Sequence, residues 1–177
     1  MLAIYLGTRG FGFALFEGQD TLVDWGVKSV TGDKSTQSLT KAKEMIGHYQ
    51  PGVLVLENAA ANDSRRSVRI RALSRSMIVW SARHNVKVRL FSRTQVKRVF
   101  FSEGHGTKQE VAERIAKRFP EELGFRLPPK RRPWMSEDYR MDIFNAIALA
   151  LAYRLKRQKR GGSAGRESFV EPGPAKS

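Results

Sequence analysis

The order of the apolar segments along the chain is the feature that most constrains its fold. Short apolar runs at 2–6, 11–16 and 21–30 are separated by glycine-rich turns, a pattern typical of an antiparallel meander. A more polar stretch at 35–49 carries apolar residues at helical spacing, and the continuous apolar run 53–56 follows it. That run indicates a strand buried in the middle of a sheet.

The remainder of the chain is predicted to be mostly helical. One further strand is expected at 86–91, and helices are expected at 67–84, 92–100, 107–119 and 136–157. The segments 102–107 and 120–136 are rich in glycine and proline respectively, which indicates loops. This order of elements predicts an α/β sandwich around a mixed five-stranded sheet flanked by helices.

Composition sets the domain organisation and the cellular setting. Residues 1–158 suit a single domain, whereas 159–177 are rich in Gly, Pro, Ser and basic residues, which predicts a disordered tail. The chain has no cysteine, which excludes disulfides and thiolate metal sites. It also shows no bilayer-spanning apolar run and no signal-peptide pattern. We therefore expect a cytoplasmic protein that does not insert into a membrane.

Basic residues are concentrated in one part of the sequence. The chain carries 32 Lys and Arg against 17 Asp and Glu, a net charge of +15. Between residues 58 and 102 Asp63 is the only acid among many basic residues. Solvated surfaces usually mix the two signs, so this imbalance favours a polyanionic partner such as nucleic acid over a merely solubilising surface.

Five segments together resemble the RuvC-type Holliday-junction resolvases, a family of the RNase H-like superfamily. They follow one another in the family's order over roughly residues 2–155, and they are specific as a set. The segments are Leu2–Ala14, Val55–Asn58, Gln95–Lys97, Thr107–Val111 and Met141–Ala150. The resemblance implies an RNase H-like fold and a magnesium- or manganese-dependent endonuclease that acts on branched DNA.

The resemblance also implies where the catalytic acids of the family fall in this chain. Its four acidic positions correspond to Tyr5, Glu57, Asp142 and Asn145, of which only Glu57 and Asp142 are acids. A neutral phenol or amide does not supply the charge that two divalent cations require. Asp138 lies four residues before Asp142, so it either adds a metal ligand on the same helix face or merely favours the helix N-terminus.

Several basic residues are the candidates for contacting nucleic acid. They are Arg9, Arg65, Arg66, Arg69, Lys97 and Lys108, the two lysines matching basic positions of the family. The aromatic residue that the family carries shortly after its second acid is replaced here by Ala59–Ala61. The family also implies a homodimer, to which the helix at 67–84 is expected to contribute.

Three functions remain open from the sequence. The chain is a junction-selective, metal-dependent endonuclease, or it is a DNA- or RNA-binding protein on the same fold that has lost cleavage. A protein-interaction subunit on this fold is the third alternative. Because Tyr5 and Asn145 replace acids, we expect binding to branched DNA with weak or absent cleavage.

Overall fold

The computed structural model describes residues 1–18 and 21–164, with side chains as far as residue 159. It contains one mixed sheet of strand order β3-β2-β1-β4-β5. The strands are β1 (Leu2–Leu6), β2 (Gly10–Glu17), β3 (Thr21–Ser29), β4 (Val53–Glu57) and β5 (Lys87–Phe91). Strands β1, β2 and β3 form an antiparallel meander, whereas β4 runs parallel to both β1 and β5. The five-stranded mixed sheet predicted from the sequence is confirmed.

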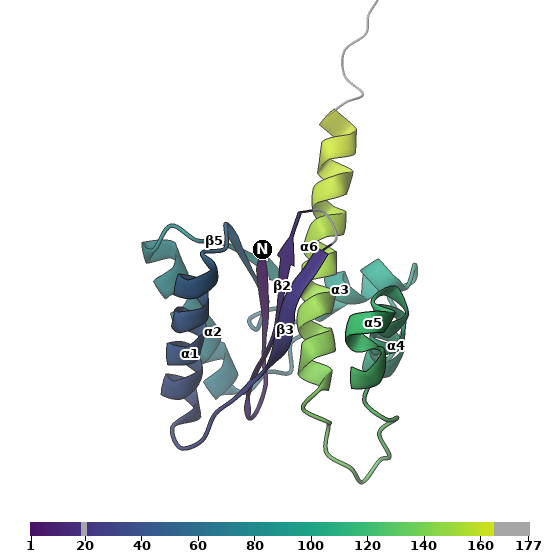
Figure 1. Cartoon of the computed structure of the whole chain (residues 1–177), viewed down its shortest axis with the longest axis horizontal. Coiled ribbons are helices and arrows are strands. Elements are labelled where there is room, and N and C mark those ends of the chain that lie inside the picture. Colours follow the sequence, from purple (N-terminus) through teal and green to yellow (C-terminus); the bar gives the residue numbers. More distant parts are fainter. Residues whose placement is uncertain (19–20, 165–177) are drawn as a thin grey trace, which may run out of the picture.

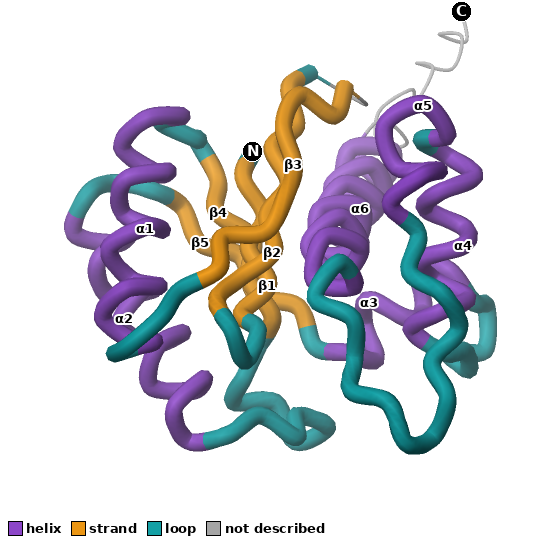
Figure 2. The backbone as a smooth tube through the Cα atoms, turned by 60° about the horizontal axis from the view of Figure 1, so that its bottom comes forward, coloured by secondary structure: helices purple, strands orange, loops and turns teal. Residues whose placement is uncertain are grey.

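Two helices cover one face of the sheet (Figures 1 and 2). They are α1 (Lys34–Tyr49) and α2 (Val68–Arg83), and each has a side-chain N-cap, Asp33 and Ser67 respectively. Their apolar residues, among them Met45 and Met77, pack with Ile4 and Leu56 in one buried cluster. The sequence boundaries of both helices are confirmed to within a residue or two.

The other face is covered by α6 (Met141–Ala164), against which the smaller helices lie (Figure 1). These are α3 (Arg93–Phe100), α4 (Lys108–Arg118), α5 (Pro120–Leu123) and the 3-10 helix η1 (Gly124–Arg126). Residues 146–152 of α6 are all buried, because this helix lies between the sheet and α4 and is covered on both sides. Capping boxes at Ser92 and Thr107 fix where α3 and α4 begin.

Two sequence expectations for the C-terminal half are wrong. The predicted loop 120–136 contains α5 and η1, because Pro120 starts a helical turn and Leu123 is fully buried. Helix α6 begins at Met141 and not at Ser136, because the Asp138 carboxylate accepts hydrogen bonds from the backbone N–H and side chain of Arg140. Such a local turn competes with helical geometry.

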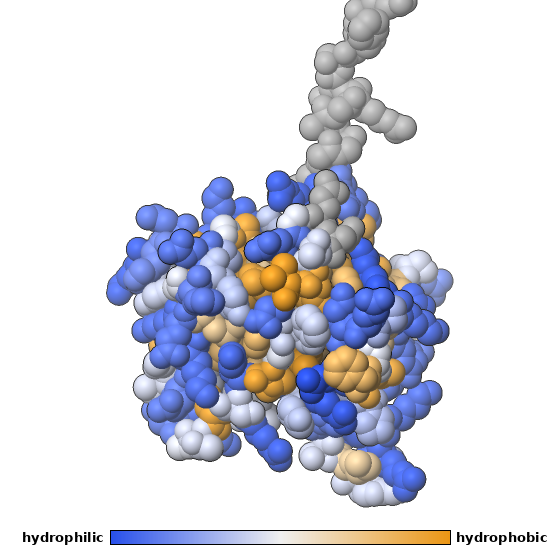
Figure 3. All heavy atoms as spheres, viewed as in Figure 1, coloured by the Kyte–Doolittle hydropathy of each residue, from blue (hydrophilic) through white to orange (hydrophobic). Residues whose placement is uncertain are grey.

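Helix α6 also extends past the predicted domain boundary at residue 158 and runs to Ala164. Residues 165–177 of the predicted tail lie outside the described residues. Within the described ranges, every helix is too short or too polar to cross a bilayer. On the face shown in Figure 3, hydrophilic residues cover the outer helices and hydrophobic ones gather toward the middle.

Candidate functional site

The candidate site lies at the edge of the sheet where β1 and β4 end. Ile4 pairs with Leu56 in parallel register, so Tyr5 and Glu57 occupy equivalent positions on neighbouring strands. Both lie on the face that α6 covers, because Ala3 and Val55 pack into the α6 cluster while Ile4 and Leu56 pack under α1 and α2. Both are also buried, with 6 % and 8 % of their surface exposed.

Two glycines bring the start of α6 close to this edge. A Cβ atom at Gly7 would lie 2.1 Å from Oδ2 of Asp142, and a Cβ atom at Gly12 would lie 2.1 Å from its backbone oxygen. Any larger residue at Gly12 would collide with backbone that cannot rotate away. The β1–β2 hairpin therefore packs directly against Asp142. Asp142 thus lies beside β1, the strand that carries Tyr5.

The carboxylate of Glu57 is bound by two arginines. Arg66 donates to Oε2 through Nε, at 2.7 Å, and through Nη2. Arg93 donates to Oε1 through Nε at 3.1 Å. The Arg66 and Glu57 side chains are only 12 % and 7 % exposed, so theirs is a largely buried, charge-assisted ion pair. Together, Arg66 at Oε2 and Arg93 at Oε1 engage both carboxylate oxygens.

The guanidinium of Arg66 also lies against Tyr5. Its central carbon is 4.3 Å from the centre of the Tyr5 ring, a cation–π contact. Burial disfavours the charge of Arg66, but Tyr5, Glu57 and Asp142 outweigh this effect, so the pKa of Arg66 is raised. A permanent cation therefore stands among three of the four positions at which the resemblance places metal-binding acids.

Asp142 titrates unusually for an aspartate. Burial raises its pKa to about 7, and nearby Glu137 adds to the rise, whereas Lys108 and Arg66 oppose it. The Asn145 side chain, one helical turn on, is close enough to lower this pKa slightly. Its buried Nδ2 nevertheless meets hydrogen-bond geometry with no group in the described residues. Asp142 is therefore only partly ionised at neutral pH.

Lys108, the first residue of α4, closes the site on another side. Its ammonium lies 5.7 Å from the centre of the Tyr5 ring and donates to both oxygens of Glu137, at 2.7 and 2.9 Å. Burial works against the charge of Lys108, but Tyr5 and Glu137 outweigh it and raise its pKa. Glu137, which the sequence analysis did not single out, thus serves as the counterion of Lys108.

A cavity of about 680 Å³ opens beside these residues. Tyr5, Glu57, Lys108 and Asn145 line it from the sheet and the helices. Its remaining charged wall is mainly basic, with Arg65, Arg93, Lys97 and Arg98 against Asp63 and Glu103. We call it the cationic cavity. The Asp63 carboxylate accepts hydrogen bonds from Thr94 at the start of α3 and is thereby partly satisfied within the fold.

The residues present do not fit a pair of divalent cations. Within residues 1–18 and 21–164, no three histidine or acidic side chains converge in a way that could hold a metal ion. Both oxygens of Glu57 already receive arginine hydrogen bonds. Asp138, the proposed extra ligand, is bound by Arg140 and precedes the first residue of α6, so it does not share a helix face with Asp142.

The structure sorts the predicted nucleic-acid contacts into two groups. Arg65, Lys97 and Lys108 line the cationic cavity. Arg66 is engaged with Glu57, Arg69 donates to the carbonyls of Gly7 and Thr8 at 3.3 and 3.4 Å, and Arg9 is exposed on the turn outside the cavity. Sequence reasoning missed the role of Arg93, although its place directly after Ser92, at the end of β5 beside β4, pointed to this edge.

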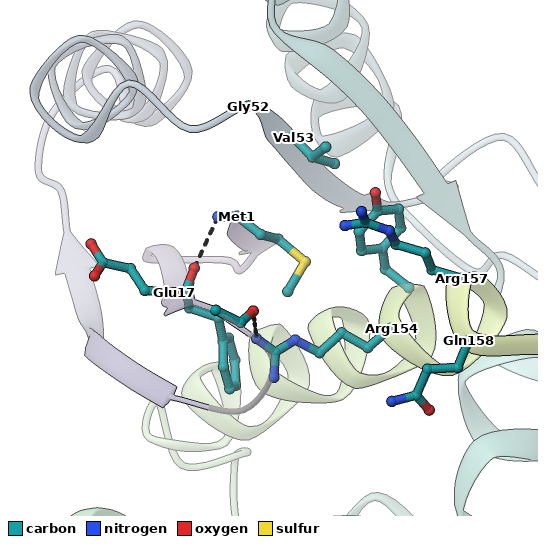
Figure 4. Close-up of a pocket in the computed structure, with 10 residues that line it drawn as sticks. Met1, Glu17, Gly52, Val53, Arg154, Arg157 and Gln158 are labelled. Atoms are coloured by element: carbon teal, nitrogen blue, oxygen red, sulfur yellow. Dashed lines mark hydrogen bonds between the residues drawn. The ribbon is translucent and has the colours of Figure 1, made fainter. Parts of the chain in front are cut away.

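A second cavity, of about 750 Å³, lies at the opposite end of the sheet (Figure 4). The amino group of Met1 donates to the Phe16 carbonyl there, and Arg154 donates to the Gly18 carbonyl. It contains none of the residues at the family's acidic positions. Of these two cavities, the cationic cavity is the one that Tyr5, Glu57 and Asn145 line.

The strand order, the three-layer arrangement and the placement of Tyr5, Glu57 and Asp142 together define an RNase H-like fold of the type seen in RuvC-type Holliday-junction resolvases. No family model and no curated protein matches the chain. Solved structures do match it, at low sequence identity.

The RuvC structure from Thermus thermophilus is 20 % identical, with a TM-score of 0.59, and the match covers 90 % of this chain and 97 % of that one. The same organism's RuvC in complex with a Holliday junction substrate is 19 % identical, with a TM-score of 0.62 and coverage of 90 % and 94 %. The yeast mitochondrial Holliday junction resolvase is 13 % identical, with a TM-score of 0.58 and coverage of 93 % and 83 %.

Proposed function

We propose that this chain binds branched DNA through the cationic cavity and that its metal-dependent cleavage is weak or lost. One observation carries the proposal: Arg66 and Arg93 occupy both oxygens of Glu57 while Arg66 lies on the ring of Tyr5. Those are the positions at which a cleaving enzyme of this type needs ionised, available carboxylates.

The charge balance at the site supports binding to phosphate over binding to metal. The carboxylates Glu57, Asp142 and Glu137 stand against the cations Arg66, Arg93 and Lys108, and the cavity wall adds Arg65, Lys97 and Arg98 against only Asp63 and Glu103. Since Asp142 is only partly ionised near pH 7, a divalent cation would meet a net positive potential. A phosphate group would meet an attractive one.

Branched DNA is the nucleic acid that the structural similarities favour. One of the matched RuvC structures holds a Holliday junction substrate, as does the Fowlpox virus resolvase structure, which is 16 % identical with a TM-score of 0.50. The cationic cavity of this chain lies at the same edge of the sheet as the residues that carry the resemblance. Its exposed cations, Arg65 and Arg98, are available to phosphates.

The proposal is tested by measuring binding to a labelled four-way junction and to a duplex by fluorescence anisotropy over a salt series. We expect tighter binding to the junction and a steep loss of affinity with salt. Arg65→Ala and Lys97→Ala should each lower the slope of log affinity against log salt by about one. The matched control is Arg75→Ala, because Arg75 is an exposed arginine of α2 outside the cavity. This variant should change neither the preference for the junction nor the slope of log affinity against log salt.

Cleavage is assayed in parallel on the same junction with Mg²⁺ or Mn²⁺. We expect no more product from the natural chain than from Glu57→Gln. Robust cutting that disappears in Glu57→Gln would overturn the loss of cleavage, and a salt-independent affinity would overturn the binding mode.

A further inference from the structure

A projecting segment beside the site presents a largely exposed tryptophan side chain. Between η1 and α6 the chain extends below the rest of the molecule, at the same end as the β1–β2 turn (Figures 1 and 2). Trp134 is 76 % exposed there, whereas the other two tryptophans, Trp25 and Trp80, are partly buried. An exposed tryptophan forgoes a large burial energy, so its exposure indicates a partner more often than does an exposed small residue.

Internal hydrogen bonds hold Trp134 at the tip of a tight turn. The N–H of Met135 donates to the carbonyl of Arg132 at 3.0 Å, and the guanidinium of Arg131 donates to the carbonyl of Met135. We call residues 131–135 the tryptophan turn. Because these bonds fix the backbone on both sides of the indole, little conformational entropy is left to be lost when the indole meets a ligand.

Contacts with α4 tie the projecting segment to the site. At one end of the segment, Gln109 donates to the carbonyl of Pro128 at 3.1 Å. At the other end, Glu137 is bound by Lys108, whose ammonium lies near Tyr5. The projecting segment, which contains the tryptophan turn, is therefore held on either side of that turn by Lys108 and Gln109, the first two residues of the helix that borders the cationic cavity.

The charges around the indole select the kind of partner. The acids of the segment are neutralised, Glu137 by Lys108 and Asp138 by Arg140. The exposed cations Arg131 and Arg132 lie within the turn, and Lys130, 3.9 Å from Glu113, precedes it. The Arg132 guanidinium lies 5.7 Å from the centre of the Trp134 ring. A planar aromatic group flanked by cations matches an unstacked nucleobase with its phosphates, and it disfavours a basic protein surface.

We propose that Trp134 stacks on an unpaired or unstacked nucleobase at the branch point of DNA held in the cationic cavity. The inference rests on the proposed function, because the same DNA must occupy both surfaces. A fully paired duplex offers no free base face except at its ends. The tryptophan turn therefore adds preference for branched over continuous DNA, while the cavity supplies general affinity for phosphate.

The test compares Trp134→Ala, Trp134→Phe and the control Phe125→Ala on a four-way junction and on a duplex of the same sequence. Phe125 is a suitable control because it is 67 % exposed and has an arginine beside its ring, yet lies outside the turn. We expect Trp134→Ala to weaken junction binding about tenfold and Trp134→Phe no more than about threefold. Duplex affinity should stay within about twofold throughout.

A junction that carries 2-aminopurine at the branch point gives a second readout. Its fluorescence should fall when the natural chain binds and should fall much less with Trp134→Ala at saturating protein. Equal losses on junction and duplex, or no loss on either, would overturn the stacking inference while leaving the proposed function intact. Failure of the natural chain itself to prefer the junction would instead overturn the proposed function. Thermal unfolding of Trp134→Ala should match the natural chain, since the indole is exposed.

Discussion

Arg66 and Glu57 form a buried ion pair at the edge of the sheet where a RuvC-type enzyme would need a free carboxylate. The pair joins the end of β4 to the segment that leads into α2, and Arg93 adds a link to the start of α3. Charge within the site is thus compensated by side chains of the chain itself. The stability of the fold and the chemistry of the site consequently depend on the same residues.

Removing the charge of Arg66 should destabilise the fold more than removing that of Arg93. We expect Arg66→Met to lower the free energy of unfolding by about 2–4 kcal/mol, because it leaves a buried carboxylate with a single partner. Arg93→Met should cost less than about 1 kcal/mol, since its side chain is 35 % exposed. Urea denaturation of the two variants checks this order, and equal losses would contradict it.

Restoring acids alone should not restore metal binding. Tyr5→Asp with Asn145→Asp supplies two carboxylates, but Arg66 remains among them. Adding Arg66→Ala removes a cation that would repel a bound metal ion. At a separation of about 4 Å and an effective dielectric constant of about 20, this repulsion costs about 4 kcal/mol for each unit of charge on the metal. Titration with Mn²⁺ followed by electron paramagnetic resonance should show that the triple variant binds Mn²⁺ at least about tenfold more tightly than the Tyr5→Asp, Asn145→Asp double variant. Equal affinities would show that Arg66 does not block the metal.

Asp142 should make the fold less stable as the pH rises. A carboxyl group with a folded-state pKa raised to about 7 binds more protons in the folded than in the unfolded state between about pH 4 and 7. Its contribution to stability is therefore present in acid and lost as the pH rises through 7. The stability of Asp142→Asn relative to the natural chain should grow by roughly 2 kcal/mol from pH 5 to pH 8.

Asp138 should show the opposite dependence of stability on pH and so serves as the control for Asp142. The hydrogen bond from Arg140 lowers its pKa, so its contribution is present above about pH 4 and is lost in acid. Asp138→Asn should therefore be less stable than the natural chain at pH 7, and this difference should disappear as the pH falls. Thermal melts of both variants across the range measure the two slopes, and slopes of the same sign would contradict the assignment.

Substitutions of Gly7 and Gly12 should show how much the fold depends on the close approach of each glycine to Asp142. Gly12→Ala places a methyl group against the Asp142 backbone and should cost about 3 kcal/mol or more. Gly7→Ala meets the Asp142 side chain, which can rotate, and should cost less. Gly47→Ala, in the open on α1, should instead gain about 0.5–1 kcal/mol through helix propensity. Chemical denaturation of the three variants ranks them.

The strand pattern was readable from the sequence because each strand has a local signature. Residues 2–6 form an apolar run, as expected of a strand covered on both faces, and residues 53–56 form another. Their parallel pairing brings Tyr5 and Glu57 together, so that part of the site followed from fold and register. Helix α6 was misjudged at its start, because the Asp138–Arg140 contact is a side-chain interaction that periodicity does not reveal.

The counterions of the site could not be derived from sequence spacing. Arg66 is one of many arginines between residues 58 and 102. Its neighbour Arg65 lines the cavity, and Arg69 donates to carbonyls of the β1–β2 turn. The path of the backbone after β4 decides that Arg66, among these, reaches Glu57. Glu137 reaches Lys108 only because the projecting segment returns to α4. Contacts of this kind depend on loop geometry.

The burial of α6 between sheet and outer helices has a consequence for how the chain acquires its structure. Phe144 and Ile147, near the C-terminal end of the sequence, cover strands formed from its first residues. During synthesis one apolar face of the β1–β3 meander therefore stays exposed until α6 has been made. In that period the exposed face is prone to aggregate with other nascent chains. Chaperone dependence should therefore be greatest for chains cut short before residue 141.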